Sequence, residues 1–191
     1  MIKLCLLRHG QTAWNQEGRW QGHADPPLNA AGLEQARLVA EELKSTCFAA
    51  IYSSDLQRAR VTAEAVAIFH ALPVKTDVRL RELNMGAWEG QLVADIPNLF
   101  PAAWAERQAD PVESRPPGGE SVRQLAQRVS QGMDAICQSN DSGQFLIVSH
   151  GLALAAFLCL AQGHPLDEAF QRIPRNARPL YLDYEPDRNS S

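Results

Sequence analysis

Short apolar runs typical of buried strands alternate along this chain with longer stretches in which apolar residues recur at helical spacing. The strand-like runs cover residues 2–7, 49–52, 72–78, 145–148 and 179–184. The helix-like stretches cover residues 29–44, 55–70, 121–137 and 152–161. Strands that alternate with amphipathic helices are typical of βαβ units. The pattern therefore predicts an α/β fold with a mostly parallel central sheet and helices on both faces.

Polar residues mark where three of these helices are expected to begin. Asn29 has the position of an N-cap. Ser54 and Ser121 each stand three residues before a glutamine, which is the spacing of a capping box. The first helix is expected to bury an apolar stripe at spacings of three and four, formed by Leu33, Ala36, Ala40 and Leu43.

Residues 79–119 interrupt the alternation with five prolines. We expect this segment to be a lid with one or two short helices. The rest of the chain shows no repeat and no linker. The sequence therefore predicts one domain over residues 1–186, followed by a polar tail over residues 187–191.

The composition excludes several classes of protein. The chain has 191 residues, of which 45% are hydrophobic and 21% charged, with a formal net charge of −4. A net negative charge argues against general binding to nucleic acid or to an anionic membrane surface. The longest apolar stretch, residues 152–161, is about half the ~20 residues that a membrane span needs. Without a signal-peptide pattern or paired cysteine spacings, we expect a soluble cytoplasmic protein.

Two of the predicted strands end in the same way. Residues 4–7 are followed by Arg8-His9-Gly10, and residues 145–148 by Ser149-His150-Gly151. Ligands of open α/β sheets bind beyond the carboxyl ends of parallel strands. The repeated pattern therefore places His9 and His150 at a candidate site. Because side chains alternate along a strand, Arg8 and His9 can face one site only if the strand ends there.

Several other kinds of site chemistry lack their sequence signals. A metal site is not predicted, because no H-E-x-x-H or similar ligand spacing is present. Ser149 is not in a G-x-S-x-G context, and there is no Walker A or G-x-G-x-x-G motif. Nucleophilic or acid/base histidine chemistry beside Arg8 and Arg58 remains. Guanidinium forks and imidazoles together suit a phosphoryl group, whose equatorial oxygens carry the charge during transfer.

Arginine outnumbers lysine by 15 to 3. We attribute most of this excess to genomic base composition. Arg8 and Arg58 alone have a chemical reason to be arginine, since lysine cannot grip a phosphoryl group with two parallel hydrogen bonds. We interpret most of the other arginines, Arg37 and Arg60 among them, as solvated charges.

Motifs spread over most of the chain resemble those of the histidine phosphatase superfamily, in its phosphoglycerate-mutase-like branch. The matching segments are Leu7-Arg8-His9-Gly10-Gln11-Thr12 with Asn15; Arg19-Trp20-Gln21-Gly22; Ser53-Ser54-Asp55-Leu56-Gln57-Arg58-Ala59; Glu82 with Trp88-Glu89-Gly90; Pro117-Gly118-Gly119-Glu120-Ser121; and Ser149-His150-Gly151. The tripeptide R-H-G alone is a weak signal, whereas the set in this order is specific.

The resemblance implies a role for each matching residue. His9 is expected to become phosphorylated, while Arg8, Arg58 and His150 hold the transferring group. Glu82 is expected to protonate the leaving oxygen, with Glu89 as the rival acid or else a carboxylate that ties a loop. The expected substrate contacts are Asn15, Gln21, Gly22 and Gly151. No cofactor and no metal ion are expected.

The segment after Glu82 favours hydrolysis over isomerisation. Leu83-Asn84-Met85 stands where mutases of the family typically carry Arg-His-Tyr, and residues 83–117 contain only two arginines, Arg107 and Arg115. We therefore expect a metal-independent phosphomonoesterase that acts on a small phosphorylated metabolite. A phosphoglycerate mutase and a non-catalytic module that binds phosphorylated ligands are the alternatives. The sequence does not select the substrate or predict an oligomeric state.

Overall fold

A five-stranded sheet forms the centre of the computed structural model, which describes residues 2–140 and 142–186. The predicted tail, residues 187–191, lies outside the described residues. The strands are β1 (Ile2–Arg8), β2 (Ala50–Ser53), β3 (Val74–Thr76), β4 (Gly143–Ser149) and β5 (Pro179–Tyr184). Their order in the sheet is β3-β2-β4-β1-β5, and only β5 pairs antiparallel among them. The predicted mostly parallel sheet is confirmed.

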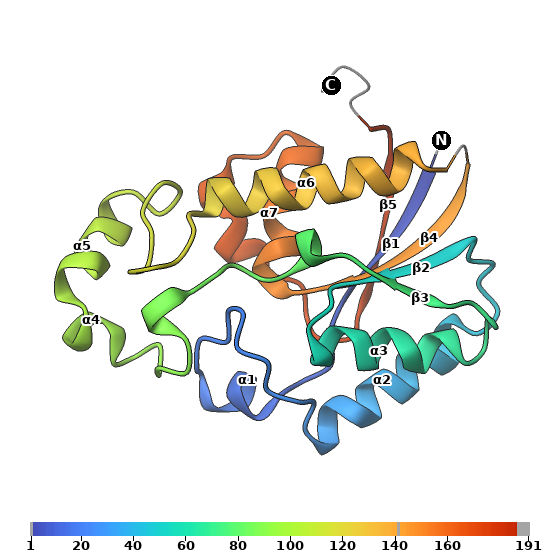
Figure 1. The fold of residues 1–191 in the computed structure, drawn as a ribbon, viewed down its shortest axis with the longest axis horizontal. Coiled ribbons are helices and arrows are strands. Elements are labelled where there is room, and N and C mark those ends of the chain that lie inside the picture. The colour runs from blue at the N-terminus through green and yellow to red at the C-terminus, as the bar shows by residue number, and fades with distance from the viewer. Residues whose placement is uncertain (1, 141, 187–191) are drawn as a thin grey trace.

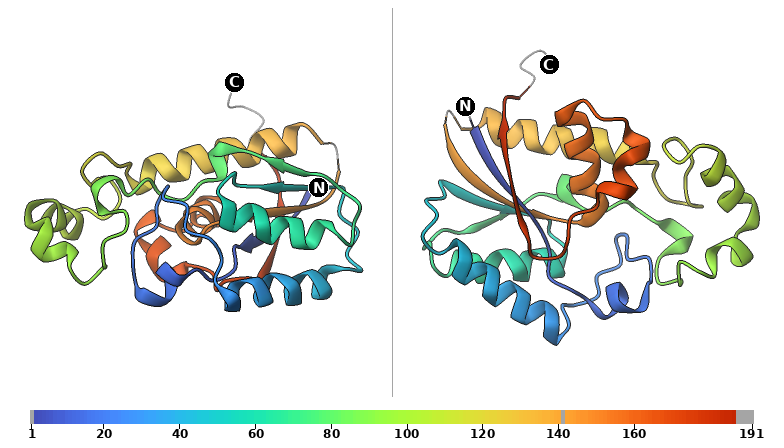
Figure 2. Two further views of the ribbon diagram at one scale, coloured as in Figure 1. Left: turned by 60° about the horizontal axis from the view of Figure 1, so that its bottom comes forward. Right: turned by 180° about the vertical axis from the view of Figure 1, so that it is seen from behind.

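Helices cover both faces of this sheet, as predicted (Figure 1). The α-helices are α1 (Ala13–Glu17), α2 (Ala30–Leu43), α3 (Gln57–Ala67), α4 (Ile96–Leu99), α5 (Pro101–Ala109), α6 (Val122–Gln138) and α7 (Gly151–Gln162). Three 3-10 segments complete the list: η1 (Val78–Leu80), η2 (Gly86–Trp88) and η3 (Leu166–Arg172). In Figure 2 the pair α2 and α3 lies on the opposite side of the strands from α6 and α7. The sequence did not predict α1 or η3.

Alternate residues of β1 belong to two separate apolar cores. Leu4 and Leu6 pack in the core that contains α6 and α7, whereas Cys5 and Leu7 pack in the core under α2 and α3. All four side chains are fully buried. A strand with both faces buried has no polar face, which explains the continuous apolar run in the sequence.

Two of the predicted helix starts are confirmed, and one is wrong. Asn29 and Ser121 are N-caps, and Ser121 forms the predicted capping box with Gln124. At α3 the N-cap is Leu56, without a side-chain cap. The amide of Gln57 instead donates to the Asp25 carboxylate at 2.8 Å, a partner distant in sequence, while the Ser54 hydroxyl accepts from the amide of Leu56 at 3.3 Å.

The predicted apolar stripe of α2 is partly wrong. Leu33 is 53% exposed, while Ala36, Ala40 and Leu43 are buried together with Val39. Leu33 lies in the first turn of α2, and the core under this helix begins one turn later.

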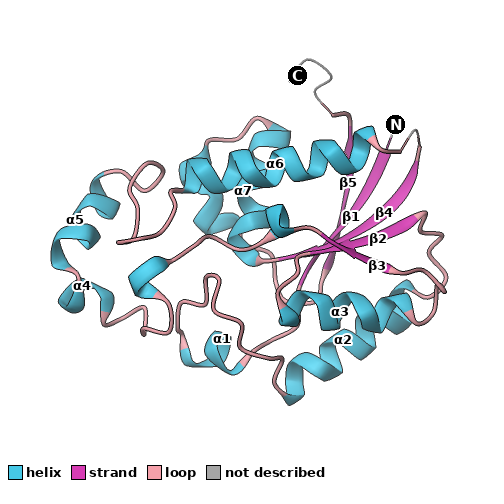
Figure 3. Cartoon of the chain, in the orientation of Figure 1, coloured by secondary structure: helices cyan, strands magenta, loops and turns pink. Residues whose placement is uncertain are grey.

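The lid predicted over residues 79–119 extends beyond the end of the sheet and carries α4 and α5, while α1 lies below it (Figure 3). The buried Trp88 packs against Phe100 and Trp104, with ring centroids 6.5 and 6.1 Å away. Arg107 is 8% exposed, and its guanidinium carbon lies 4.4 Å from the ring centroid of Phe170. Arg107 is therefore an exception among the arginines, because its cation packs among aromatic rings rather than in solvent.

No helix within residues 2–140 and 142–186 is long and apolar enough to cross a membrane.

Candidate active site

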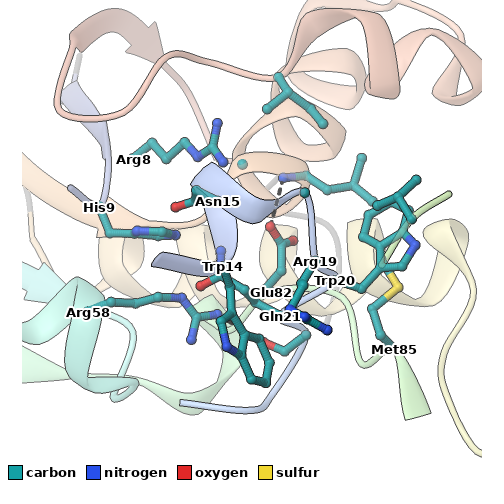
Figure 4. Close-up of a pocket in the computed structure, with 16 residues that line it drawn as sticks. Arg8, His9, Trp14, Asn15, Arg19, Trp20, Gln21, Arg58, Glu82 and Met85 are labelled. Carbon is teal, nitrogen blue, oxygen red and sulfur yellow. Dashed lines mark hydrogen bonds between the residues drawn. The ribbon is translucent and has the colours of Figure 1, made fainter. Parts of the chain in front are cut away.

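A cavity of about 160 Å³ lies between the carboxyl ends of the strands and the first residues of the lid (Figure 4). Eight of the nine predicted site residues line it: Arg8, His9, Asn15, Gln21, Gly22, Arg58, Glu82 and Gly151. The ninth, His150, is fully buried behind the ring of His9, and the two ring centroids are 5.2 Å apart. The structure thus brings together residues from strand ends, helix starts and the lid.

His9 is held as a neutral imidazole with one free nitrogen. Its strand ends at Arg8, so His9 is free of the strand's alternation, as expected. Its Nδ1 lies 2.6 Å from the Gly10 carbonyl oxygen, an acceptor, so Nδ1 carries the proton and Nε2 keeps its lone pair. Burial, together with the charges of Arg58 and Arg8, lowers the pKa of His9 well below 6.5. The ring is therefore uncharged at neutral pH, with its one proton on Nδ1, and Nε2 can act as a nucleophile.

His150 is a second buried imidazole with an unexpected partner. Its Nε2 lies 2.8 Å from the hydroxyl of Ser54, the residue that the sequence had placed as a helix cap. Burial and the nearby charge of Arg58 lower the pKa of His150 well below 6.5. Its Nδ1 is buried and has no hydrogen-bond partner among the described residues.

Two guanidinium groups line the cavity on either side of His9 in the view of Figure 4. Arg58, in the first turn of α3, donates to the carbonyl oxygens of Ala24 at 2.8 Å and Gly22 at 2.9 Å. Arg8 donates to the Pro174 carbonyl at 2.9 Å. Burial lowers the pKa of Arg58 to about 10, so the group stays charged at neutral pH. In the described part of the chain, Nε of each arginine is buried without an acceptor, which leaves both groups able to bind an anion.

Glu82 faces His9 across the cavity (Figure 4). Its carboxylate accepts hydrogen bonds from the amides of Leu152 and Ala153, both at 3.0 Å, in the first turn of α7. Its backbone carbonyl accepts from His23 Nε2 at 2.9 Å and from Arg128 Nη2 at 3.1 Å. The side chain and the main chain of Glu82 are therefore both fixed.

Glu89 has the loop-tying arrangement instead. Its carboxylate accepts from the amides of His23 at 2.7 Å, Ala24 at 2.9 Å and Met85 at 3.3 Å. It does not line the cavity in the described structure. These contacts connect the loop that supplies the carbonyl acceptors of Arg58 to the segment after Glu82.

The amide side chains of Asn15 and Gln21 present donors to the cavity. The Asn15 oxygen accepts from the amide of Thr12 at 3.1 Å, and the Gln21 oxygen accepts from the Thr12 hydroxyl at 3.1 Å. Because both oxygens are engaged by Thr12, the two NH2 groups remain available to a ligand.

Gly151 lines the cavity at a position where a side chain would not fit. A Cβ atom at this position would lie 2.9 Å from Ile173 Cγ2 and 3.2 Å from Arg8 Cζ. The glycine lets α7 begin directly against the guanidinium of Arg8. Its predicted place in the site is thus explained by close approach.

The arrangement offers N–H donors, two fixed cations, one nucleophilic nitrogen and one carboxylate around a small space. This set fits a phosphoryl group. No group of three or more His, Cys, Asp and Glu side chains in residues 2–140 and 142–186 could hold a metal ion. Metal-free chemistry remains a prediction.

The sequence did not identify several residues that shape this site. Ser54 contacts His150, and Asn176 donates to the backbone carbonyl of His9 at 2.7 Å. Arg128 is a further residue of this kind, since it donates to the carbonyl oxygens of Arg79 and Arg81 at 2.8 and 3.1 Å. The signals available for Ser54 were its position shortly after the predicted strand over residues 49–52 and its place in a matching motif.

The sequence profile described as "Histidine phosphatase superfamily (branch 1)" matches residues 4–191. The chain belongs to this superfamily, as the motifs predicted. A probable phosphoglycerate mutase GpmB of Proteus mirabilis is 38% identical over 186 residues, which is 97% of this chain and 86% of that protein.

Solved structures give the same fold. The α-ribazole phosphatase of Shigella flexneri has a TM-score of 0.89 at 28% identity, covering 96% of this chain and 91% of that one. A mycobacterial glucosyl-3-phosphoglycerate phosphatase, solved in complex with VO3, has a TM-score of 0.86 at 32% identity, covering 96% and 93%. The chain is therefore an enzyme of a superfamily whose similar members are named as phosphatases and as mutases.

Proposed function

We propose that this protein is a phosphomonoesterase that hydrolyses a small phosphorylated metabolite through a phosphohistidine at His9. One observation carries the proposal: the free Nε2 of a neutral His9 lies in a cavity flanked by two guanidinium groups, with a carboxyl group on the far side. Phosphoryl transfer needs this in-line order of nucleophile, phosphorus and proton donor.

In the first step, the lone pair of His9 Nε2 forms a bond to phosphorus while the bond from phosphorus to the ester oxygen breaks. Glu82 enters this step protonated and gives its proton to the leaving oxygen. The alcohol departs, and His9 carries the phosphoryl group on Nε2. Gly10 keeps the proton of Nδ1 in its hydrogen bond throughout.

In the second step, a water molecule attacks phosphorus and the bond to Nε2 breaks. Glu82, now a carboxylate, accepts the proton of that water and returns to its acid form. Phosphate leaves, and His9 is again neutral. One residue serves as acid and then as base, because water enters on the side from which the alcohol left.

Charge stabilisation in both steps is assigned to Arg8, Arg58 and His150, with the amides of Asn15 and Gln21 as further donors. The two arginines are already anchored to backbone carbonyls, so little reorganisation is needed when charge develops on the equatorial oxygens. The transferring group thus meets donors that are fixed before it arrives.

The lid supports water as the acceptor. Of its two arginines beyond Glu82, Arg107 is packed among aromatic rings and Arg115 lines a different cavity. The third guanidinium on the catalytic cavity, that of Arg19, is paired with Glu17 at 2.6 Å. A mutase that handles a bisphosphate needs cations for its second phosphate, and the described lid directs neither of these arginines into the cavity.

The decisive experiment is to trap the covalent intermediate. The protein is mixed with p-nitrophenyl phosphate, quenched in base, and its peptides are analysed by mass spectrometry for one added phosphoryl group on His9. We expect acid-labile label on His9, phosphate release that EDTA does not reduce, and no label in His9→Ala. EDTA-sensitive turnover or full activity of His9→Ala would contradict the proposal.

The phosphoglycerate mutase reading has support from the name of the Proteus mirabilis relative. Incubation with 3-phosphoglycerate and 2,3-bisphosphoglycerate separates the two functions. Isomer interconversion faster than phosphate release would establish the mutase. Ligand binding without any product would instead indicate a non-catalytic module. A panel that includes phosphoserine and α-ribazole phosphate would then identify the preferred ester.

A further inference from the structure

A second cavity shares a wall with the catalytic one. Its volume is about 420 Å³, and we call it the Arg175 groove after the segment that forms it, residues 173–178. Arg8 and Ile173 line both the groove and the catalytic cavity. Arg8 and Ile173 therefore lie at the boundary that the two spaces share.

The groove concentrates positive charge that has no counterion. Nine arginines of the described chain are in ion pairs with Asp or Glu, and five are not. Three of these five, Arg8, Arg175 and Arg178, line the groove, while Arg107 and Arg115 lie elsewhere. No carboxylate is among the residues that line it. In a chain with a net charge of −4, such a patch is a local exception that attracts small anions.

The segment that carries these arginines is fixed to the catalytic residues. The Pro174 carbonyl accepts from Arg8 Nη1 at 2.9 Å, Asn176 Nδ2 donates to the His9 carbonyl at 2.7 Å, and the Ala177 amide donates to the Arg8 carbonyl at 2.9 Å. Ala177 has φ of 50°, a left-handed conformation that costs a non-glycine residue energy. Arg175 and Arg178 thus have backbones placed in a fixed relation to Arg8.

We propose that the Arg175 groove is a second anion subsite, which binds a carboxylate or phosphate group carried by the same substrate whose phosphoryl group occupies the catalytic cavity. The inference rests on the proposed function, because it assigns the substrate class: a phosphomonoester with a second anionic group. A free oxyanion has the same chemistry and is the alternative source that the experiment separates.

The test compares two esters of similar size that differ in charge, 3-phosphoglycerate and glycerol monophosphate. Phosphate release is measured for the wild type and for the double variant Arg175→Gln, Arg178→Gln. We expect the variant to lose about tenfold in kcat/KM for 3-phosphoglycerate, mainly through KM, and less than twofold for glycerol monophosphate. Arg115→Gln is the matched control, because this arginine also lacks an ion pair in the described structure but lines another cavity.

Two results with the esters would overturn the assignment. Equal losses for both esters would reveal general attraction of anions without a subsite, and unchanged rates would remove the groove from the reaction. If the groove holds a free oxyanion, sulfate should change kcat for p-nitrophenyl phosphate at saturating substrate in the wild type but not in the double variant. If no ester is hydrolysed, the proposed function fails, and calorimetric binding of 3-phosphoglycerate to the wild type and the double variant still tests the groove.

Discussion

The two sides of the catalytic cavity are built in different ways. His9 and His150 follow β1 and β4, which pair residue by residue up to Arg8 and Ser149. Glu82 lies in the lid, where side chains hold the backbone: Arg128 alone donates to the carbonyl oxygens of Arg79, Arg81 and Glu82 and also pairs with Glu120. The nucleophile side depends on a backbone ladder and the acid side on side-chain contacts. Substitution of single side chains should therefore disturb the acid side more easily than the nucleophile side.

Removing the nucleophile should have the largest effect. His9→Ala is expected to lower kcat for p-nitrophenyl phosphate by a factor of about 10³ or more, because no other group with a free lone pair is assigned to attack phosphorus. Circular dichroism and thermal unfolding should show a folded protein, since the sheet does not depend on the ring. His164→Ala, outside the cavity, is the control and should keep full activity. Comparable losses in both variants would refute the assignment.

The acid side is tested with two carboxylates seven residues apart. Glu82→Gln should lower kcat by about 10²-fold for an alkyl phosphate, because the leaving alkoxide needs a proton, and much less for p-nitrophenyl phosphate. Glu89→Gln should instead lower the free energy of unfolding by about 1–3 kcal/mol. Glutamine has only one acceptor oxygen, so it cannot accept all three of the amide hydrogen bonds that the carboxylate accepts. Urea titrations and steady-state rates separate the two. A leaving-group effect in Glu89→Gln would reverse the roles.

Arg128 tests whether the acid side depends on side-chain anchors. Arg128→Lys keeps the charge but cannot reach three carbonyls and a carboxylate at once, so we expect about a tenfold loss of kcat with alkyl phosphates through misplacement of Glu82. The loss should nearly vanish with p-nitrophenyl phosphate. Arg123→Lys, on the same helix and paired with Glu113, is the matched control. A loss of kcat of equal size with alkyl phosphates and with p-nitrophenyl phosphate would show that Arg128 acts only on stability.

The pH dependence of stability tests the nucleophile side without a change in activity. Burial and arginine charges lower the pKa of His9 and His150 below 6.5 in the folded protein. The unfolded chain therefore binds protons first as the pH falls, and the free energy of unfolding should decrease below pH 6.5 by about 1.4 kcal/mol per pH unit for each histidine until its folded pKa is reached. His23, whose pKa burial also lowers, contributes with the same sign.

Urea unfolding at pH 7.5 and 5.5 measures this slope. The double variant His9→Gln, His150→Gln should show a clearly smaller decrease than the wild type. Parallel stability curves would mean that the two rings are not kept neutral by the fold.

The sequence predicted the nucleophile side well and the acid side poorly, for a physical reason. Residues 2–7 and 145–148 are continuous apolar runs, which is the local pattern of buried strands. The strand ends and both histidines could therefore be located from the sequence. Glu82 was found through the family motif. Its anchors, His23 and Arg128, are 59 and 46 residues away along the chain, and no local pattern reports such contacts. The wrong prediction of a cap at Ser54 has the same origin, because the amide of Gln57 donates to the carboxylate of Asp25, which is 32 residues away.

The order of the strands has a consequence for synthesis of the protein. β1 is made early, yet its neighbours in the sheet are β4 and β5, and the segment that holds the His9 carbonyl lies at Asn176. A ribosome must therefore translate nearly all of the described chain before His9 acquires its final surroundings. Until β4 is made, the apolar strand that precedes His9 has no partner in the sheet, which exposes it to chaperones and to aggregation. Phosphatase activity should accordingly appear only after β5 leaves the ribosome.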